Sequence, residues 1–188
     1  MKKLIMFMLI ITGLTFSQVN NQPSIAFNTI TFDSDALFGF DVSYAINPNN
    51  TKLYFGMSYG SSFYRSGYEY INEEYEDSEV LSDLGLLFGI KYIQANPSII
   101  FGNYKYDYNE WDADSGLLIK ENLKIIYIGF GVGLKVNIPL TNKVMFTIIP
   151  KMNWIWRTEY TRNGITKYTN DTHNINVFKL SSGLTFNF

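Results

Sequence analysis

The last eleven residues of the chain alternate between two faces of an expected strand. Phe178, Leu180, Ser182, Leu184, Phe186 and Phe188 share one face, and Lys179, Ser181, Gly183, Thr185 and Asn187 share the other. Successive side chains of a β-strand point to opposite sides of the sheet. A mainly apolar face that ends on an aromatic residue is unfavourable in water and favourable against lipid. The pattern therefore predicts a sheet whose outer side contacts a membrane.

The same period of two continues upstream, interrupted by turn residues. We expect strands at about 24–32, 36–46, 52–63, 80–92, 98–108, 122–137, 144–157 and 174–188. The alternation of the first strand is too weak to assign its faces. Eight strands of this kind predict an all-β fold, an eight-stranded antiparallel up-and-down transmembrane β-barrel.

The connections between the expected strands differ in length at the two ends. Short turns are predicted at 47–50, 94–97 and 139–142, where Asn and Pro supply the backbone geometry. Longer polar loops are predicted at 64–79, 109–121 and 158–173, whereas the connection at 33–35 is unusually short. Short periplasmic turns and long outer loops are typical of bacterial outer-membrane barrels.

The apolar stripes of the strands are expected to face lipid, and the glycine-rich stripes to face the lumen. A Lys or Arg on the lipid face near the bilayer midplane costs about 2 to 4 kcal/mol, so charges test this assignment. The interpretation places these charges in a lumen network: Asp41, Asp83, Lys91, Lys105, Asp107, Lys135, Lys151, Arg157 and Lys179. Lys124 falls on the apolar stripe, at the outer end of its strand, where its ammonium could reach the headgroups.

Six basic and three acidic lumen residues allow either a narrow ion path or a paired, closed interior. Eight strands leave little room for water, and an unpaired buried charge is unfavourable, which favours the closed interior. Aromatic girdles are expected near the outer rim at Tyr59, Phe63, Tyr106, Tyr108, Trp154 and Trp156, and near the inner rim at Tyr44, Tyr92, Phe186 and Phe188. Pro150 lies in mid-strand and predicts a bulge or bend.

Two soluble alternatives place the apolar stripes inward. A β-sandwich core would account for the aromatics, but not for charges on the opposite face of nearly every strand. A soluble lipocalin-like carrier is the other, although the Gly-x-Trp signature of lipocalins is missing.

The N-terminus resembles an export signal. Lys2 and Lys3 precede an apolar run at 4–14, and Thr15, Phe16 and Ser17 follow it. This predicts a Sec signal peptide at 1–17 and a barrel domain at 18–188, exported to the cell outer membrane. An uncleaved membrane helix would need about 20 apolar residues.

Composition excludes several classes of site. The chain has no cysteine, which excludes disulfides, a thiolate metal site and a lipoprotein anchor. Removing two lysines with the signal takes the formal charge from −2 to −4. No broad basic surface for nucleic acid is expected.

Three motifs carry a resemblance to a known family. They are the terminal segment 183–188, the turn segment 138–143, and the end of the signal at 16–18. The mature chain resembles the small eight-stranded outer-membrane barrels of the OmpA/OmpX-like superfamily, which includes Bacteroidetes-type outer membrane beta-barrel proteins. The resemblance implies contact with outer-membrane lipid and lipopolysaccharide, and recognition of Phe186 and Phe188 by the barrel-assembly machinery. It does not specify an activity.

Candidates for chemistry are few, and we expect no enzyme activity, cofactor or metal. The chain has one histidine, His173, and Ser181 and Ser182 on the same strand lie roughly 25 to 30 Å away at 3.3 Å per residue. The acidic segment 64–79 could bind Ca²⁺, as could Glu110, Asp112 and Asp114, but the segment lacks EF-hand spacing and is better interpreted as solvated. We therefore expect a structural or surface-interaction protein acting through its long loops, with a narrow pore for a small solute as the alternative.

Overall fold

The alternating sequence forms long antiparallel strands in the computed structural model, which describes residues 20–32, 35–48, 51–70, 73–112, 117–163, 165–167 and 175–188. The strands are β1 (Asn20–Phe32), β2 (Asp35–Asn47), β3 (Leu53–Tyr70), β4 (Glu73–Ile90), β5 (Ile93–Asp112), β6 (Leu117–Pro139), β7 (Val144–Arg162), β8 (Ile165–Lys167) and β9 (Ile175–Phe186). No helix among these residues has the length and hydropathy needed to span a membrane.

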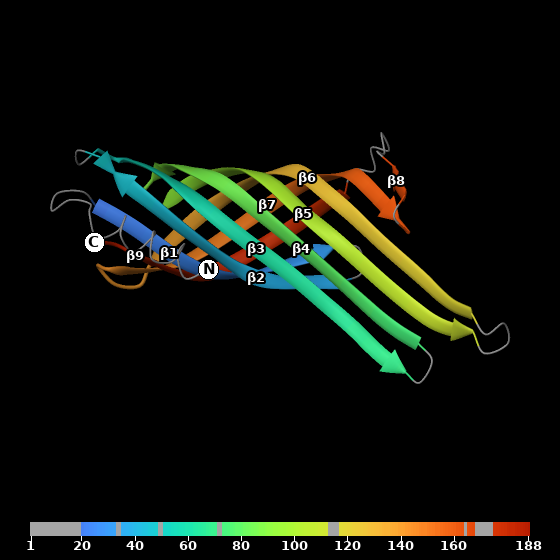
Figure 1. Cartoon of the computed structure of the whole chain (residues 1–188). Coiled ribbons are helices and arrows are strands. Elements are labelled where there is room, and N and C mark those ends of the chain that lie inside the picture. Colours follow the sequence, from blue (N-terminus) through green and yellow to red (C-terminus); the bar gives the residue numbers. More distant parts are fainter. Residues whose placement is uncertain are drawn as a thin grey trace.

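Eight of these strands close into a barrel (Figure 1). Each strand from β1 to β7 pairs antiparallel with the next, β7 pairs with β9, and β9 pairs with β1. Among the described strands, the three-residue β8 pairs with the end of β7 alone and lies outside the ring. The predicted eight-stranded antiparallel barrel is confirmed.

The barrel is longer on one side, because β3 to β6 continue past their neighbours (Figure 1). Pairing of β2 with β3 stops at Phe63, yet β3 and β4 stay paired as far as Tyr70 and Glu73. We call the extension the projecting sheet and define it as residues 64–70, 73–80, 103–112 and 117–124. The predicted loops at 64–79 and 109–121 are therefore wrong over most of their length. Their polar residues suggested loops, but a sheet solvated on both faces can carry polar side chains on each.

The turn predicted at 94–97 is also wrong. The turn is Lys91 and Tyr92, and β5 starts at Ile93. Proline lacks the N–H that a strand neighbour would receive, so Pro97 suggested a turn. In the barrel the β4–β5 ladder skips the pairs next to Pro97, and the Asn96 amide donates instead to the Leu86 carbonyl at 3.0 Å.

The irregularity expected at Pro150 takes a mild form. The β6–β7 ladder omits the pairs around Pro150, but its register is the same on both sides of the gap. The register shift lies further along, where Ile126 pairs with Glu159 and Tyr127 pairs with Arg157, leaving Thr158 as the extra residue. The predicted loop at 158–173 is partly strand, because β7 runs to Arg162 and β8 follows.

The apolar stripes face outward, as predicted. Large exposed hydrophobic side chains form a belt around the barrel, including Phe27, Phe38, Met57, Leu86, Ile99, Ile128, Val132, Met152 and Phe178. β1 joins this pattern, with Ile25 and Phe27 outward and Ser24, Ala26 and Asn28 buried. The orientation that a lipocalin-like carrier or a sandwich core requires is therefore excluded.

One strand was assigned to the wrong faces. On β5, Lys105 and Asp107 share the outward face with Ile99 and Phe101, while Tyr106 and Tyr108 lie on the lumen side of the projecting sheet. Lys105 and Asp107 therefore do not enter the lumen, and the two tyrosines are not part of an outer girdle. The outward face of β5 can carry Lys105 and Asp107 because this part of the strand extends beyond the apolar belt.

Candidate functional site

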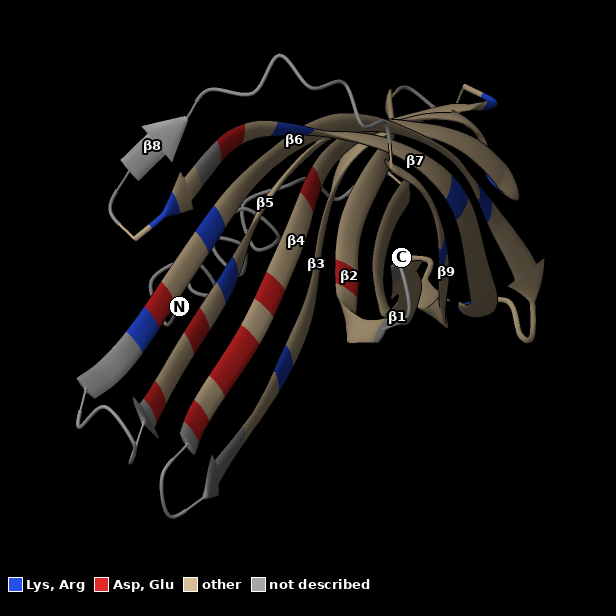
Figure 2. Cartoon of the chain, turned by 90° about the vertical axis from the view of Figure 1, so that its right-hand side faces the viewer, with Lys and Arg blue, Asp and Glu red and all other residues tan. Residues whose placement is uncertain are grey.

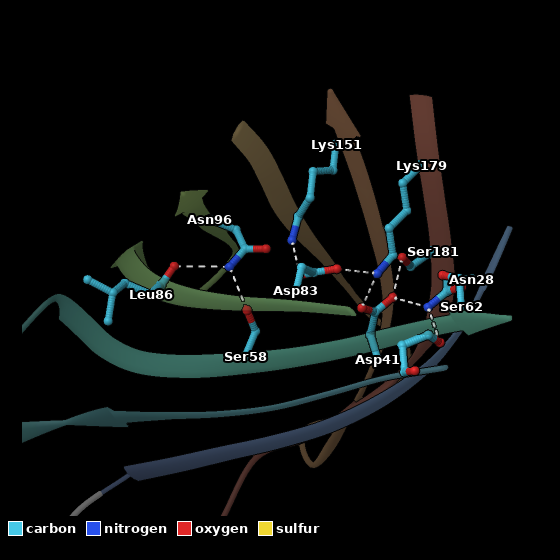
Figure 3. Close-up of polar contacts among 11 residues, drawn as sticks. Asn28, Asp41, Ser58, Ser62, Asp83, Leu86, Asn96, Lys151, Lys179 and Ser181 are labelled. Atoms are coloured by element: carbon cyan, nitrogen blue, oxygen red, sulfur yellow. Dashed lines mark hydrogen bonds and ion pairs between the residues drawn. The ribbon is translucent and has the colours of Figure 1, made fainter. Parts of the chain in front are cut away.

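Four charged side chains meet in the middle of the lumen, and we call them the ion cluster (Figure 3). Lys151 on β7 lies 2.6 Å from one oxygen of Asp83 on β4. Lys179 on β9 lies 2.7 Å from the other Asp83 oxygen and 2.6 Å from Asp41 on β2. Two ammonium and two carboxylate groups thus alternate in a chain with no net charge. All four side chains are buried.

Neutral side chains complete the hydrogen bonding of Asp41. Ser181 donates to its second oxygen at 2.5 Å, and the Asn28 amide donates to the same oxygen at 3.1 Å. Ser62 in turn donates to the Asn28 carbonyl oxygen at 2.7 Å. A buried charge is tolerated when its remaining lone pairs are satisfied, which this arrangement achieves for Asp41.

Glycine provides the space for the ion cluster. A Cβ placed on Gly60 of β3 would overlap side-chain atoms of Asp41, Lys179 and Asp83. A Cβ on Gly133 of β6 would come within 3.2 Å of the Lys151 side chain. The small residues of the lumen stripe therefore lie opposite its longest side chains.

Lys135 occupies a separate polar layer, nearer the end of the barrel that carries the β2–β3, β4–β5 and β6–β7 turns. Its ammonium donates to the hydroxyls of Ser24 and Ser43, each at 3.0 Å, and the side chain is fully buried. Within the described part of the chain no carboxylate forms an ion pair with it. Still nearer the turns, Thr147, Thr185 and Asn137 form a hydrogen-bonded group.

An apolar layer fills the lumen on the other side of the ion cluster, and we call it the apolar plug. Its buried residues are Ile30, Leu37, Leu81, Ile100, Ile125, Tyr127, Ile155 and Val177. Tyr64 on β3 packs against them, so each of the eight barrel strands contributes a side chain. The lumen is therefore closed by apolar contacts above the ion cluster rather than lined by polar groups along its whole length.

The remaining predicted network residues lie apart from the ion cluster. Lys91 is in the β4–β5 turn, with its ammonium 5.6 Å from the Tyr92 ring centroid. Arg157 lies beyond the apolar plug, half-buried on the lumen side of β7 and close to the Tyr127 hydroxyl. Lys105 and Asp107 are exposed on the outward face of the projecting sheet.

Sequence reasoning missed the neutral members of the lumen. Ser24 and Asn28 lie on β1, whose faces could not be assigned because threonines and other short residues blur its alternation. Pairing decides the faces: Asn28 lies opposite Gly39 on β2 and Ser181 on β9. The usable signal was the spacing of Gln22, Ser24 and Asn28 at even intervals, with Phe27 on the other face.

The projecting sheet combines tyrosines with carboxylates. Segments 64–80 and 103–124 together carry eleven carboxylates and four basic residues. On the lumen-side face, Tyr75 donates to Asp77 at 2.9 Å and packs edge-on against Tyr106, with ring centroids 5.4 Å apart. Tyr106 stacks on Tyr108, which donates to Glu110 at 2.9 Å. Figure 2 shows the acidic bands concentrated on β4.

Burial and acidic neighbours raise the pKa of tyrosine hydroxyls on this face. Burial, with a further contribution from Asp77, raises the pKa of Tyr104 to about 12. The same two causes raise the pKa of Tyr75. These phenols therefore stay protonated and able to donate hydrogen bonds at any physiological pH.

Several predicted features lie outside the described residues. The signal peptide at 1–17, Asp114 and His173 fall there. Among the residues that are described, no group of three or more acidic or histidine side chains could hold a metal ion. Phe186 and Phe188 stack with ring centroids 6.4 Å apart, and their recognition by the assembly machinery stays a prediction.

Comparisons with known proteins give the fold. No protein-family model and no curated protein sequence matches this chain. A major outer membrane protein from Thermus thermophilus is similar in structure, with a TM-score of 0.58 and 12% identity over 91% of this chain and 100% of that one. Ail, the attachment invasion locus protein of Yersinia pestis, gives a TM-score of 0.48 and 12% identity over 90% of this chain and 97% of that one. The first likeness shows that the chain has the fold of an outer-membrane barrel.

Proposed function

We propose that the protein is an integral outer-membrane barrel that anchors the projecting sheet and presents it to a basic surface partner. The membrane placement is supported by the outward apolar belt, because large exposed side chains such as Phe27, at 78% exposure, are unfavourable in water. The fold it shares with the Thermus protein agrees with this placement. Lipid and lipopolysaccharide would then surround the belt, after export by the N-terminal signal and assembly through the C-terminal segment.

The observation that carries the surface role is the projecting sheet itself. A membrane anchor needs strands only long enough to cross the bilayer, about 9 to 11 residues. β5 has 20 residues and β6 has 23, so a large part of both lies beyond the belt. Among its described side chains, seven carboxylates and five tyrosines offer charge complementarity to a cationic partner and a hydrogen-bonding aromatic surface.

One measurement tests the membrane anchor, and a second tests whether the lumen is closed. The full protein should float with lipid vesicles and resist extraction at high pH; recovery in the aqueous fraction would overturn the placement. In planar bilayers it should give no stable single-channel conductance, because buried apolar side chains from the barrel strands fill this layer of the lumen. Steady channels would instead favour the narrow-pore alternative.

The surface role is tested by capture of proteins that bind the intact protein in outer membranes. A variant with Glu74→Gln, Glu76→Gln and Asp107→Asn removes three charges from the outward face of the projecting sheet. Glu159→Gln on β7 is the control, since it changes a carboxylate outside that sheet. We expect a basic partner that is captured by the wild type and the control and lost with the triple variant. Identical capture by all three proteins would contradict the role.

A further inference from the structure

Two lysines lie directly opposite each other on the outward face of the barrel. Lys105 on β5 pairs with Lys124 on β6, so their Cβ atoms are separated by about 5 Å, the usual spacing of cross-strand neighbours. Both side chains are exposed, and neither makes an ion pair with any described residue. Like charges in this position repel and destabilise the strand pair. An anion that lies between them would relieve this repulsion.

The pair marks the edge of the apolar belt. On β5 the outward residues are Ile99 and Phe101, then Asn103, and then Lys105. On β6 the outward apolar run ends at Ile126, and Lys124 follows. These lysines are thus the first charges past the belt on both strands. In a membrane this is the depth of the lipid headgroups, where phosphates are concentrated.

A groove of about 400 Å³ lies next to the pair. Its lining includes the short polar side chains Ser82 and Asn103, the larger Val80, Phe101 and Ile126, and Lys124 at one side. A surface depression with apolar walls beside a cation matches a lipid, whose acyl chain is apolar and whose headgroup is charged.

The acidic side chains nearby do not neutralise the pair. Asp107 follows Lys105 two residues further from the belt, and Glu159 lies opposite Ile126. Neither forms an ion pair with Lys105 or Lys124.

We propose that Lys105 and Lys124 bind the phosphate of an anionic membrane lipid whose acyl chain lies in the adjacent groove. The proposal rests on the membrane placement proposed above. Two ammonium groups on neighbouring strands would contact phosphate oxygens from both sides, and Asn103 would offer an amide donor at the base of the headgroup.

The test uses the full purified protein in detergent, with phosphatidylglycerol as the probe and native mass spectrometry to count retained lipids. We compare the wild type, a K105Q/K124Q variant, and a K52Q/K143Q control that removes two exposed lysines at the turn end. The wild type and the control should retain one phosphatidylglycerol, and K105Q/K124Q should bind it roughly thirtyfold more weakly, as expected for two lysine charges near a membrane surface. Neutral phosphatidylcholine should be retained by none of them.

Equal retention of phosphatidylglycerol by all three proteins would overturn the proposal, as would equal retention of phosphatidylcholine. Ser82→Leu tests the groove separately, because it fills the groove and leaves both lysines in place. Unchanged retention of phosphatidylglycerol would show that the acyl chain does not lie in the groove. Vesicle flotation of each variant separates the two proposals. A protein that floats but retains no anionic lipid contradicts only the lipid site, whereas one that does not float contradicts the membrane placement.

A second readout depends on the repulsion between the lysines. In neutral vesicles, K105Q alone should raise the urea midpoint of unfolding, because it removes a like-charge contact. In vesicles rich in phosphatidylglycerol the same substitution should lower the midpoint, because it removes a phosphate contact. A shift of the same sign in both lipids would contradict binding.

Discussion

The Lys179 ammonium lies 2.7 Å from the Asp83 carboxylate, and the two side chains come from opposite walls of the barrel. β9 and β4 are four strands apart around the ring in either direction. One ion pair therefore spans the whole width of the lumen. Asp41 and Lys151 extend the contact to β2 and β7, so the ion cluster links side chains from four strands of the barrel (Figure 3).

Loss of Lys179 should destabilise the barrel strongly. Lys179→Met leaves Asp41 without its ammonium partner and Asp83 with only Lys151, and removing one partner of a buried ion pair costs about 3 to 5 kcal/mol. Lys135→Met is the matched control, since Lys135 is equally buried but its partners are two serine hydroxyls. The control should cost little or raise stability. Urea unfolding in lipid vesicles measures both, and equal losses would contradict the central role of the ion cluster.

A methyl group at Gly60 should disrupt the same cluster. Gly60→Ala would place a Cβ among Asp41, Asp83 and Lys179, and overpacking of a filled interior costs about 1 to 3 kcal/mol. Gly133→Ala should cost less, because its nearest atoms lie 3.2 Å away and belong partly to the flexible Lys151 side chain. The comparison uses the urea midpoint of each variant. A larger loss for Gly133→Ala would show that the ion cluster has room to move at Gly60.

The outward belt predicts a depth-dependent penalty for charge. Leu86→Arg places a cation in the apolar belt of β4, where the cost is about 2 to 4 kcal/mol if the residue lies near the bilayer midplane. Ser78→Arg puts the same side chain on the same face of β4, eight residues nearer the tip of the projecting sheet. It should cost less than Leu86→Arg, because it is opposed only by the like charges of Arg65 and Lys105 on the neighbouring strands. Folding yield into vesicles and urea stability report the difference. Equal effects would mean that lipid does not cover Leu86.

The pH dependence of the projecting sheet follows from Tyr104. Burial and Asp77 favour the protonated phenol and raise its pKa from 10.0 to about 12. The associated stability is complete below pH 10 and is lost as the pH rises through about 12. Phenolate absorbance of the wild type minus that of Tyr104→Phe should show one group titrating near the raised value. If the difference instead showed a group that titrates at the ordinary tyrosine pKa, Tyr104 would be exposed to water.

The amino-acid sequence alone was enough to predict the eight-stranded barrel and the faces of most strands, but not the faces of β1 or of β5. A period of two with large apolar residues on one side specifies strands with lipid outside, since only the outward face tolerates Phe, Ile and Leu in that number. It also predicted the short turns at one end of the barrel, except the turn placed at 94–97. There a side-chain amide, that of Asn96, replaces the N–H that Pro97 lacks.

Which charges meet depends on how the strands are arranged in three dimensions. Sequence alternation places a residue on a face but does not give its height, and the strand register and tilt bring Asp41, Asp83, Lys151 and Lys179 to one level while Lys135 lies at another. The same limitation explains Lys105, because a charge beyond the apolar belt can lie on the outward face without penalty. The lengths of the strands depend on pairing as well. The polar segments 64–79 and 109–121 become strands because the two halves of each segment pair with one another, from Tyr64 with Glu79 and from Asn109 with Lys120. The alternation within one half of a segment does not reveal this pairing.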